Sequence, residues 1–201
     1  MNKEIDISNV TLKTERLLLR PWRLTDLDDF YEYSSVDGVG QMAGWIPHEN
    51  KEKSKQILDL FINEKKTFAI EHSGKVIGSL GIEKYGMEDK LTEFENFYGR
   101  EIGYVLSKDY WGHGLMPEAV GAVIDFLFKD LDLDFLICGY YDFNRQSKRV
   151  QEKCGFKPYR SLIMETRMGT KEHGTLNILT NPNKNIRFEF SHPETLIYKE
   201  D

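Results

Sequence analysis

The segment that most constrains the fold lies at residues 100–131, where a strand pattern, a glycine turn and a helix pattern follow one another directly. REIGYVLS, residues 100–107, is typical of a strand, and PEAVGAVIDFLFKDL, residues 117–131, has apolar residues at helical spacing. Between them, Gly112 and Gly114 let the backbone turn with its N–H groups pointing inward. This order predicts a sheet with helices packed against it.

The same turn has the features of an anion site. It consists of Trp111, Gly112, His113, Gly114, Leu115 and Met116. Unpaired N–H groups and the positive end of the following helix favour a phosphate or pyrophosphate there. The turn lacks the GK[ST] of a Walker loop and the third glycine of a dinucleotide fingerprint. A tight turn with a purely structural purpose is the alternative interpretation.

The first third of the chain predicts one strand and two helices. Residues 16–22, RLLLRPW, form an apolar run that indicates a strand. Thr25 stands where an N-cap belongs, ahead of a helix over 26–35 with acids in its first turn. A glycine-containing loop follows, and residues 51–66 then return to helical spacing.

The middle of the chain predicts strands and one more helix. The period changes to two over residues 67–85, which contain a Ser-Gly turn and therefore indicate a β-hairpin. Residues 135–141, FLICGYY, indicate a buried strand. Asn144 is the expected N-cap of a helix that ends at Gly155 in a left-handed cap.

The C-terminal part is less regular. Apolar patches at 159–164 and at 186–190 with 195–198 indicate strands, and we expect the polar stretch 169–185 between them to be a long loop. No repeat or linker is visible in the sequence. We therefore expect one domain over residues 1–201, with a mixed sheet and helices on both of its faces.

Charge and composition disfavour several classes of protein. Lysine and arginine number 27 against 33 acids, a formal charge of −6, whereas nucleic-acid surfaces need clustered cations. Because no signal core or apolar run of about 18 residues appears, we expect a cytoplasmic protein without a membrane partner. Cys138, Cys154 and the five histidines lack metal-ligand spacing. We expect both cysteines to be buried or half-buried and no metal to bind.

Two segments carry a resemblance to a known family. IGYVLSKDYWGHGLMPEAV, residues 102–120, resembles the acetyl-CoA motif of the GNAT N-acetyltransferase superfamily, and NRQSKRVQEKCGFKP, residues 144–158, resembles its second motif. TERLLLRPW and SGKVIGSLGI also match, and the combination is most similar to the Rim-type branch of ribosomal-protein alanine N-acetyltransferases. The resemblance covers residues 11–160. It implies a mostly antiparallel sheet of six or seven strands, splayed at the fourth, with about four helices.

The resemblance implies acetyl-CoA as cosubstrate and an amine as acceptor. The superfamily pattern has Arg or Gln where this chain has Trp111, and Gly or Ala where it has Met116. Because pyrophosphate is bound mainly by backbone N–H groups, residues 111–116 are still expected to hold it. Asn144 is expected to contact the pantetheine arm, although an asparagine there also caps its helix.

The resemblance also suggests catalytic groups. An alkylamine has a pKa of about 10 and must lose its proton before it attacks. Glu101 is the first candidate base and Glu83 its rival; a solvated strand-end carboxylate is the alternative for Glu101. The N–H of Val105 or Leu106 is the expected oxyanion donor. Ser147 occupies the place of a serine that faces the sulfur, although it could equally bond its own helix backbone.

The acceptor is the open question. Trp45 lies in a loop, residues 39–48, that would overhang the acceptor side; an ordinary surface loop is the alternative. Tyr140 and Tyr141 are expected to be core or rim aromatics. The resemblance implies that the protein modifies either a protein N-terminus or a small amine such as an amino sugar, polyamine or antibiotic. A CoA-binding module without catalysis is the alternative from another class, and oligomeric state is not determined.

Overall fold

The computed structural model describes residues 1–86, 91–186 and 196–199. The chain folds into two compact units. The α1–α2 unit comprises Ile5–Ile82 and Gly103–Val123. The α4 unit comprises Met1–Glu4, Glu83–Ile102 and Ile124–Asp201. The single domain expected over residues 1–201 stays a prediction.

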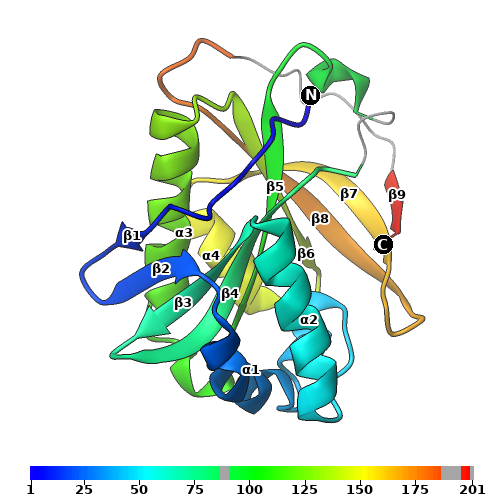
Figure 1. The fold of residues 1–201 in the computed structure, drawn as a ribbon. Helices are drawn as coiled ribbons and strands as arrows, with labels where there is room; N and C mark the ends of the chain where they lie inside the picture. The colour runs from blue at the N-terminus through cyan, green and yellow to red at the C-terminus, as the bar shows by residue number, and fades with distance from the viewer. Residues whose placement is uncertain (87–90, 187–195, 200–201) are drawn as a thin grey trace. The chain divides into compact units, whose positions relative to one another are not determined.

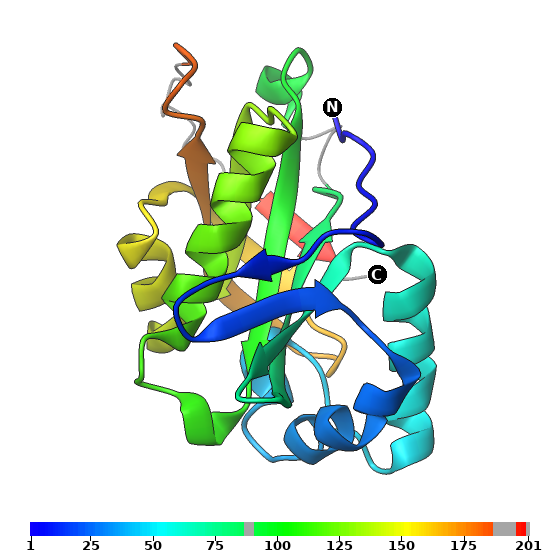
Figure 2. The same ribbon diagram turned by 60° about the vertical axis from the view of Figure 1, so that its left-hand side comes forward.

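The strands of the α1–α2 unit form an antiparallel meander (Figures 1 and 2). It consists of β1 (Leu12–Lys13), β2 (Leu17–Pro21), β3 (Thr67–His72) and β4 (Lys75–Glu83), paired in that order. The second half of β5 (Gly99–Leu106) follows β4. A Cβ added to Gly78 of β4 would lie 2.4 Å from the carbonyl oxygen of Val105, so only glycine allows this close approach.

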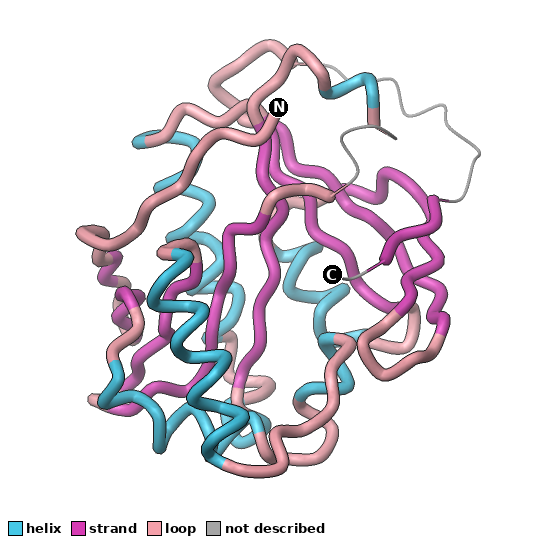
Figure 3. The backbone as a smooth tube through the Cα atoms, turned by 45° about the vertical axis from the view of Figure 1, so that its right-hand side comes forward, coloured by secondary structure: helices cyan, strands magenta, loops and turns pink. Residues whose placement is uncertain are grey.

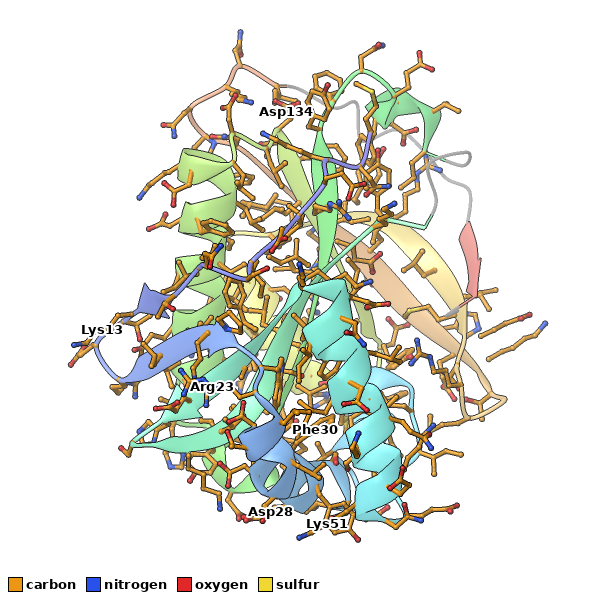
Figure 4. The ribbon with its side chains drawn as sticks, in the orientation of Figure 1. Lys13, Arg23, Asp28, Phe30, Lys51 and Asp134 are labelled. Carbon is orange, nitrogen blue, oxygen red and sulfur yellow. The ribbon has the colours of Figure 1, made fainter. Side chains whose placement is uncertain are left out.

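Helices α1 (Leu27–Ser34) and α2 (Lys51–Glu64) belong to the same unit. Asn50 caps α2 by accepting a hydrogen bond from Lys53 N at 2.9 Å. The exposed ends of the two helices are joined by a salt bridge of 2.7 Å between Lys51 and Asp28 (Figure 4).

The expected N-cap at Thr25 is wrong. Residues Leu24–Asp26 form a 3-10 turn, and Asp26 is the N-cap of α1. The cause is a buried ion pair: both Asp26 oxygens accept from the guanidinium of Arg20, at 2.8 and 2.9 Å, and one of them also accepts from the backbone N–H of Arg23. The Asp26 side chain therefore satisfies the backbone N–H of Arg23 at the start of the 3-10 turn and makes no cap hydrogen bond to α1.

An apolar cluster fills this unit. Its buried members are Trp22, Phe30, Tyr33, Val39, Leu58, Ala69 and Val76. They come from α1, α2, β3, β4 and the loop after α1, together with Trp22, which directly follows β2. Figures 1 and 2 show α3 (Leu115–Asp125) on the other side of β2, β3 and β4 from α1 and α2. This arrangement agrees with helices on both faces of the sheet.

The α4 unit has both parallel and antiparallel strand pairs; its strands are among those coloured magenta in Figure 3. β5 pairs in parallel with β6 (Phe135–Tyr141) over the three residues Gly99–Glu101. The order continues through β8 (Lys171–Thr180), β7 (Lys157–Glu165) and β9 (Leu196–Lys199). β8 is antiparallel to both of its neighbours, and β9 is parallel to β7.

The long loop expected over 169–185 is wrong, because its middle forms the ten-residue strand β8. Leu176 and Ile178 are buried at the centre of this strand, between the polar residues that made the stretch look irregular. A Cβ added to Gly174 would lie 2.4 Å from the carbonyl oxygen of Tyr140, so the glycine serves close packing. Of the last two predicted strands, β9 agrees with that at 195–198, and residues 187–190 lie outside the described residues.

Helices α3 (Leu115–Asp125) and α4 (Arg145–Lys153) each follow a strand. α3 starts two residues before Pro117 and ends in a π-helical turn, Phe126–Asp130. The described residues contain four α-helices, as predicted, and nine strands, more than the six or seven expected; the mixed α/β class is as predicted. Within the described part of the chain, no helix is long and apolar enough to cross a bilayer.

Candidate functional site

The glycine turn has the conformation that the sequence predicts. After β5, a 3-10 turn at Lys108–Tyr110 leads into Trp111, and Gly112 and Gly114 follow with φ of +82° and +75°. These angles lie in the left-handed region, where other residues are strained. A Cβ added to Gly112 would meet nothing within 4 Å, so the backbone there borders open space.

Arg16 holds this turn from outside. Its Nη1 donates to the carbonyl oxygen of His113 at 2.9 Å, and its Nε donates to Glu118 Oε2 at 2.7 Å. In a trans peptide the carbonyl and the following N–H point in opposite directions. The contact with His113 therefore directs the N–H of Gly114 away from Arg16.

Glu118, in the first turn of α3, completes this contact. Its Oε1 accepts from Thr14 Oγ1 at 2.6 Å and from the backbone N–H of Arg16 at 2.9 Å. Burial alone would raise the pKa of Glu118, but the hydrogen bonds from Thr14 and Arg16 outweigh it and hold the pKa below its usual value. The carboxylate is thus charged near the helix N-terminus, where a negative charge is favourable.

The other side chains of the turn have different surroundings. The indole of Trp111 donates to the carbonyl oxygen of Leu106 at 2.8 Å and contacts the same apolar cluster as Val105. Leu115 and Met116 are buried, whereas His113 is exposed. The groups that these six residues can present to an anion are therefore mainly backbone N–H groups.

The loop after α1 is tightly packed at its second glycine. A Cβ added to Gly40 would lie 2.3 Å from the ring of Trp45, and Trp45 N donates to Gly40 O at 3.1 Å. Trp45 in turn lies beside His48, with 5.1 Å between ring centroids. Gly40 therefore makes room for the indole of Trp45.

His48 fastens the end of this loop. Its Nδ1 lies 3.0 Å from Ser34 Oγ and 2.8 Å from Ser54 Oγ, so the ring joins α1 to the first turn of α2. Burial, with a smaller contribution from nearby Lys53, lowers the pKa of His48 to about 4. The imidazole is therefore neutral at neutral pH.

In the α4 unit, Asn144 and Ser147 meet at the start of α4. Asn144 Oδ1 accepts from Ser147 N at 3.0 Å, which confirms the predicted N-cap. Asn144 is buried, and Ser147 is half-buried. Gly155, with φ of +88°, ends the helix region as predicted.

Both candidate bases belong to the α4 unit. Glu101 is the third residue of β5 and stands opposite Ile137 of β6 in the parallel register. Its carboxyl atom Oε2 is buried. Glu83 is the last residue of β4 and is half-buried. Neither position favours one carboxylate over the other as a base.

The tyrosine and cysteine candidates are placed as the sequence suggested. Tyr140 and Tyr141 are buried, and Tyr141 belongs to the apolar cluster of its unit. Cys138 is buried and Cys154 half-buried, and burial raises the pKa of the Cys154 thiol to about 11. Among the residues that the structure describes, no group of three or more His, Cys, Asp or Glu side chains is placed to hold a metal ion.

The structure thus brings together two sets of predicted residues. Trp45, Val105 and Trp111 contact one apolar cluster in the α1–α2 unit. Asn144 and Ser147 are bonded to each other in the α4 unit, which also contains Glu83 and Glu101.

Sequence reasoning missed three polar side chains. Arg16 and Glu118 hold the glycine turn, and Gln151 donates to Ser147 Oγ. Glu118 had a weak signal, an acid in a first helical turn, and Gln151 had another, its place four residues after Ser147. No local pattern connects Arg16 with residue 113.

Comparison with known proteins identifies a matching family model and a related sequence. A family model described as an acetyltransferase (GNAT) domain matches residues 16–157. An uncharacterized N-acetyltransferase, p20, of Bacillus licheniformis is 30% identical over 132 residues, which cover 62% of this chain and 69% of that protein.

Solved structures share the fold at lower identity. A GNAT-family acetyltransferase from Bacillus anthracis has a TM-score of 0.74 at 22% identity, covering 86% of this chain and 99% of that one. A ribosomal-protein-S5-alanine acetyltransferase from Vibrio fischeri has a TM-score of 0.67 at 22% identity, covering 87% of this chain and 98% of that one. A spermidine N-acetyltransferase from Vibrio cholerae, in complex with CoA and spermine, has a TM-score of 0.66 at 17% identity, covering 84% of this chain and 97% of that one.

Proposed function

The chain belongs to the GNAT acetyltransferase domain family, and we propose from this premise that it transfers an acetyl group from acetyl-CoA directly to a primary amine. The observation that carries the proposal is the Gly112–Gly114 turn at the start of α3, whose backbone Arg16 orients from outside. Backbone N–H groups at such a turn favour a pyrophosphate.

The residues present fit this cosubstrate. Gly112 borders open space, and the contact of Arg16 with His113 directs the N–H of Gly114 away from the guanidinium. Acetyl-CoA would supply an activated acyl thioester. Residues 111–116 would hold its phosphates, and Asn144 would hold the pantetheine arm while it caps α4.

Three groups of the chain would act on the reacting atoms. Glu101, or its rival Glu83, would take the proton of the amine. The backbone N–H of Val105 or Leu106 would stabilise the oxyanion. Ser147 would give a proton to the departing thiolate, whose conjugate thiol has a pKa of about 8.5.

Direct transfer requires no nucleophile from the enzyme. Cys138 is buried, and a thiol with a pKa of about 11, as at Cys154, is almost wholly protonated at neutral pH. Both observations support transfer without a covalent acetyl-enzyme.

The acceptor has two candidates. The Rim-type resemblance and the likeness to the Vibrio fischeri S5-alanine acetyltransferase support a protein N-terminus. The likeness to the Vibrio cholerae spermidine acetyltransferase supports a small polyamine, which the formal charge of −6 would also attract. Peptides that begin with alanine, tested against polyamines, amino sugars and aminoglycosides, separate the two by their kcat/KM.

A CoA-binding module without catalysis is the alternative from another class. The test is release of CoA from acetyl-CoA with this panel of amines, together with direct measurement of acetyl-CoA binding. Glu101→Gln should lower kcat about a hundredfold, because the carboxamide cannot take a proton. Glu83→Gln is the matched control, and a loss there in place of Glu101 would identify the rival base. Binding without turnover on any amine would overturn the enzyme proposal.

A further inference from the structure

Gln151 of α4 is a polar side chain in the interior of the α4 unit. It is fully buried, with 0% of its surface exposed, on the side of the helix that also carries Asn144 and Ser147. Burying a carboxamide costs free energy unless its hydrogen bonds are replaced. The hydrogen-bond partners of the Gln151 carboxamide therefore indicate its role.

All of its partners lie within the α4 unit. Nε2 of Gln151 donates to the carbonyl oxygen of Gly139 on β6 and to Ser147 Oγ, each at 3.1 Å. Oε1 accepts from Asn177 Nδ2 of β8 at 2.8 Å. One side chain thus connects two strands with the serine expected to face the sulfur.

The chemistry of Gly139 determines the direction of these bonds. A backbone carbonyl only accepts, so the nitrogen of Gln151, and not its oxygen, must face it. The oxygen then faces β8, where Asn177 must offer its N–H₂ group. The second hydrogen of Nε2 consequently points at Ser147, whose Oγ accepts it and whose own hydrogen must point elsewhere than at Gln151.

We propose that Gln151 is a positioning residue that orients the Ser147 hydroxyl for proton donation, and this rests on the proposed function. The side chain of Ser147 is held by Gln151, and its backbone N–H by Asn144 at 3.0 Å. A donor already aimed at Oγ directs the hydroxyl proton away from the helix interior and stabilises charge that develops on the oxygen as the proton leaves.

The test is a double-mutant cycle in the CoA-release assay. Gln151→Met keeps an unbranched chain of similar size and removes the donor, and Ser147→Ala removes the hydroxyl. Each should lower kcat about tenfold with less than a twofold change in the KM for acetyl-CoA, as expected for a lost transition-state contact. The double variant should be no slower than Ser147→Ala alone, because Gln151 acts through Ser147.

The matched control is Gln146→Met, the same change at an exposed position of the same helix, which should leave kcat unchanged. Losses that multiply in the double variant, or a full loss in Gln151→Met with none in Ser147→Ala, would overturn the proposal. So would an unchanged kcat in Gln151→Met. If the wild-type protein releases no CoA with any amine, it is the proposed function that fails.

Gln151→Glu keeps the test decisive if Gln151→Met does not fold. A glutamate has the same shape and, when protonated, donates to one of the two former acceptors. When it ionises, it accepts from Ser147 and turns the hydroxyl proton inward. Burial raises such a pKa above about 4.3, so kcat should fall as pH rises, in a step that the wild type and Ser147→Ala lack. Identical pH profiles would contradict the proposal.

Discussion

The starts of α3 and α4 both follow a strand, yet they are built in opposite ways. At α4 the Asn144 side chain accepts the N–H of Ser147, so the helix uses its own residue as a cap. At α3 the contact comes from Arg16, which binds the carbonyl of His113 and so occupies no N–H. The first arrangement satisfies a backbone donor, whereas the second orients backbone donors.

Because of this difference, the starts of α3 and α4 suit different kinds of chemistry. A turn with two glycines at positive φ, flanked by the buried side chains of Leu115 and Met116, has little but its backbone to offer a ligand. Backbone donors suit the fixed charge of a phosphate. The start of α4 offers a hydroxyl and a carboxamide, which suit hydrogen bonding and proton transfer.

The largest effect that separates the two helix starts is expected from Arg16→Ala. The KM for acetyl-CoA should rise about tenfold, because the His113–Gly114 peptide loses the charged donor that orients it. The Arg16 side chain is 41% exposed, which limits the effect. A short acetyl thioester without phosphates should react as before.

The control for Arg16 is Lys13→Ala, which removes an exposed cation from neighbouring β1 (Figure 4). An equal loss with the short thioester would mean that Arg16 does not act through the phosphate turn. An equal effect of Lys13→Ala would mean that net charge, and not orientation, is responsible.

A smaller effect is expected at Asn144, where capping and binding can be separated. Asn144→Asp keeps an acceptor for Ser147 N but removes the N–H₂ group, so stability should hold while the KM for acetyl-CoA rises about threefold. Asn144→Ala should also lower the free energy of unfolding by about 1 kcal/mol through the lost cap. Urea denaturation and steady-state kinetics measure the two. A normal KM in Asn144→Asp would leave Asn144 a cap only.

The smallest expected effect compares the two units and concerns how their stability depends on pH. In the unfolded chain His48 protonates near the usual histidine pKa of 6.5, whereas in the folded α1–α2 unit its pKa is about 4. The unfolded state therefore binds more protons as pH falls, and stability present above pH 6.5 is lost progressively toward pH 4. Between about pH 7 and 5.5 the expected loss is about 1 kcal/mol.

Denaturation of the wild type and of His48→Gln at both pH values checks this. The variant should lose less stability on acidification, since its side chain does not titrate. The Ser147, Gln151 and Asn177 network of the α4 unit contains no group that ionises near neutral pH, so hydrogen exchange around it should change less. An equal acid sensitivity in wild type and variant would contradict the assignment to His48.

Local signals predicted much of the fold and part of the site. The cap at Asn144, the left-handed end at Gly155 and the turn at Gly112 and Gly114 are all properties of a few adjacent residues, and all are present. β8 was missed because its buried Leu176 and Ile178 alternate with polar residues in a stretch rich in turn formers. Its strand is stabilised by pairing with β6 and β7 along its length.

The sequence by itself determined the order of most elements up to α4, the glycine turn, the cap at Asn144, the left-handed end at Gly155 and membership in the acetyltransferase family. Only the tertiary structure decided which distant side chains support them. Arg16 donates a hydrogen bond to the carbonyl of His113, 97 positions away in the sequence, and Asn177 donates one to Gln151, 26 positions away. The physical reason is the separation in sequence over which each kind of contact acts. Caps and turns depend on neighbours in the chain, whereas a buried carboxamide or a bound guanidinium is satisfied by whatever group the folded strands bring to it.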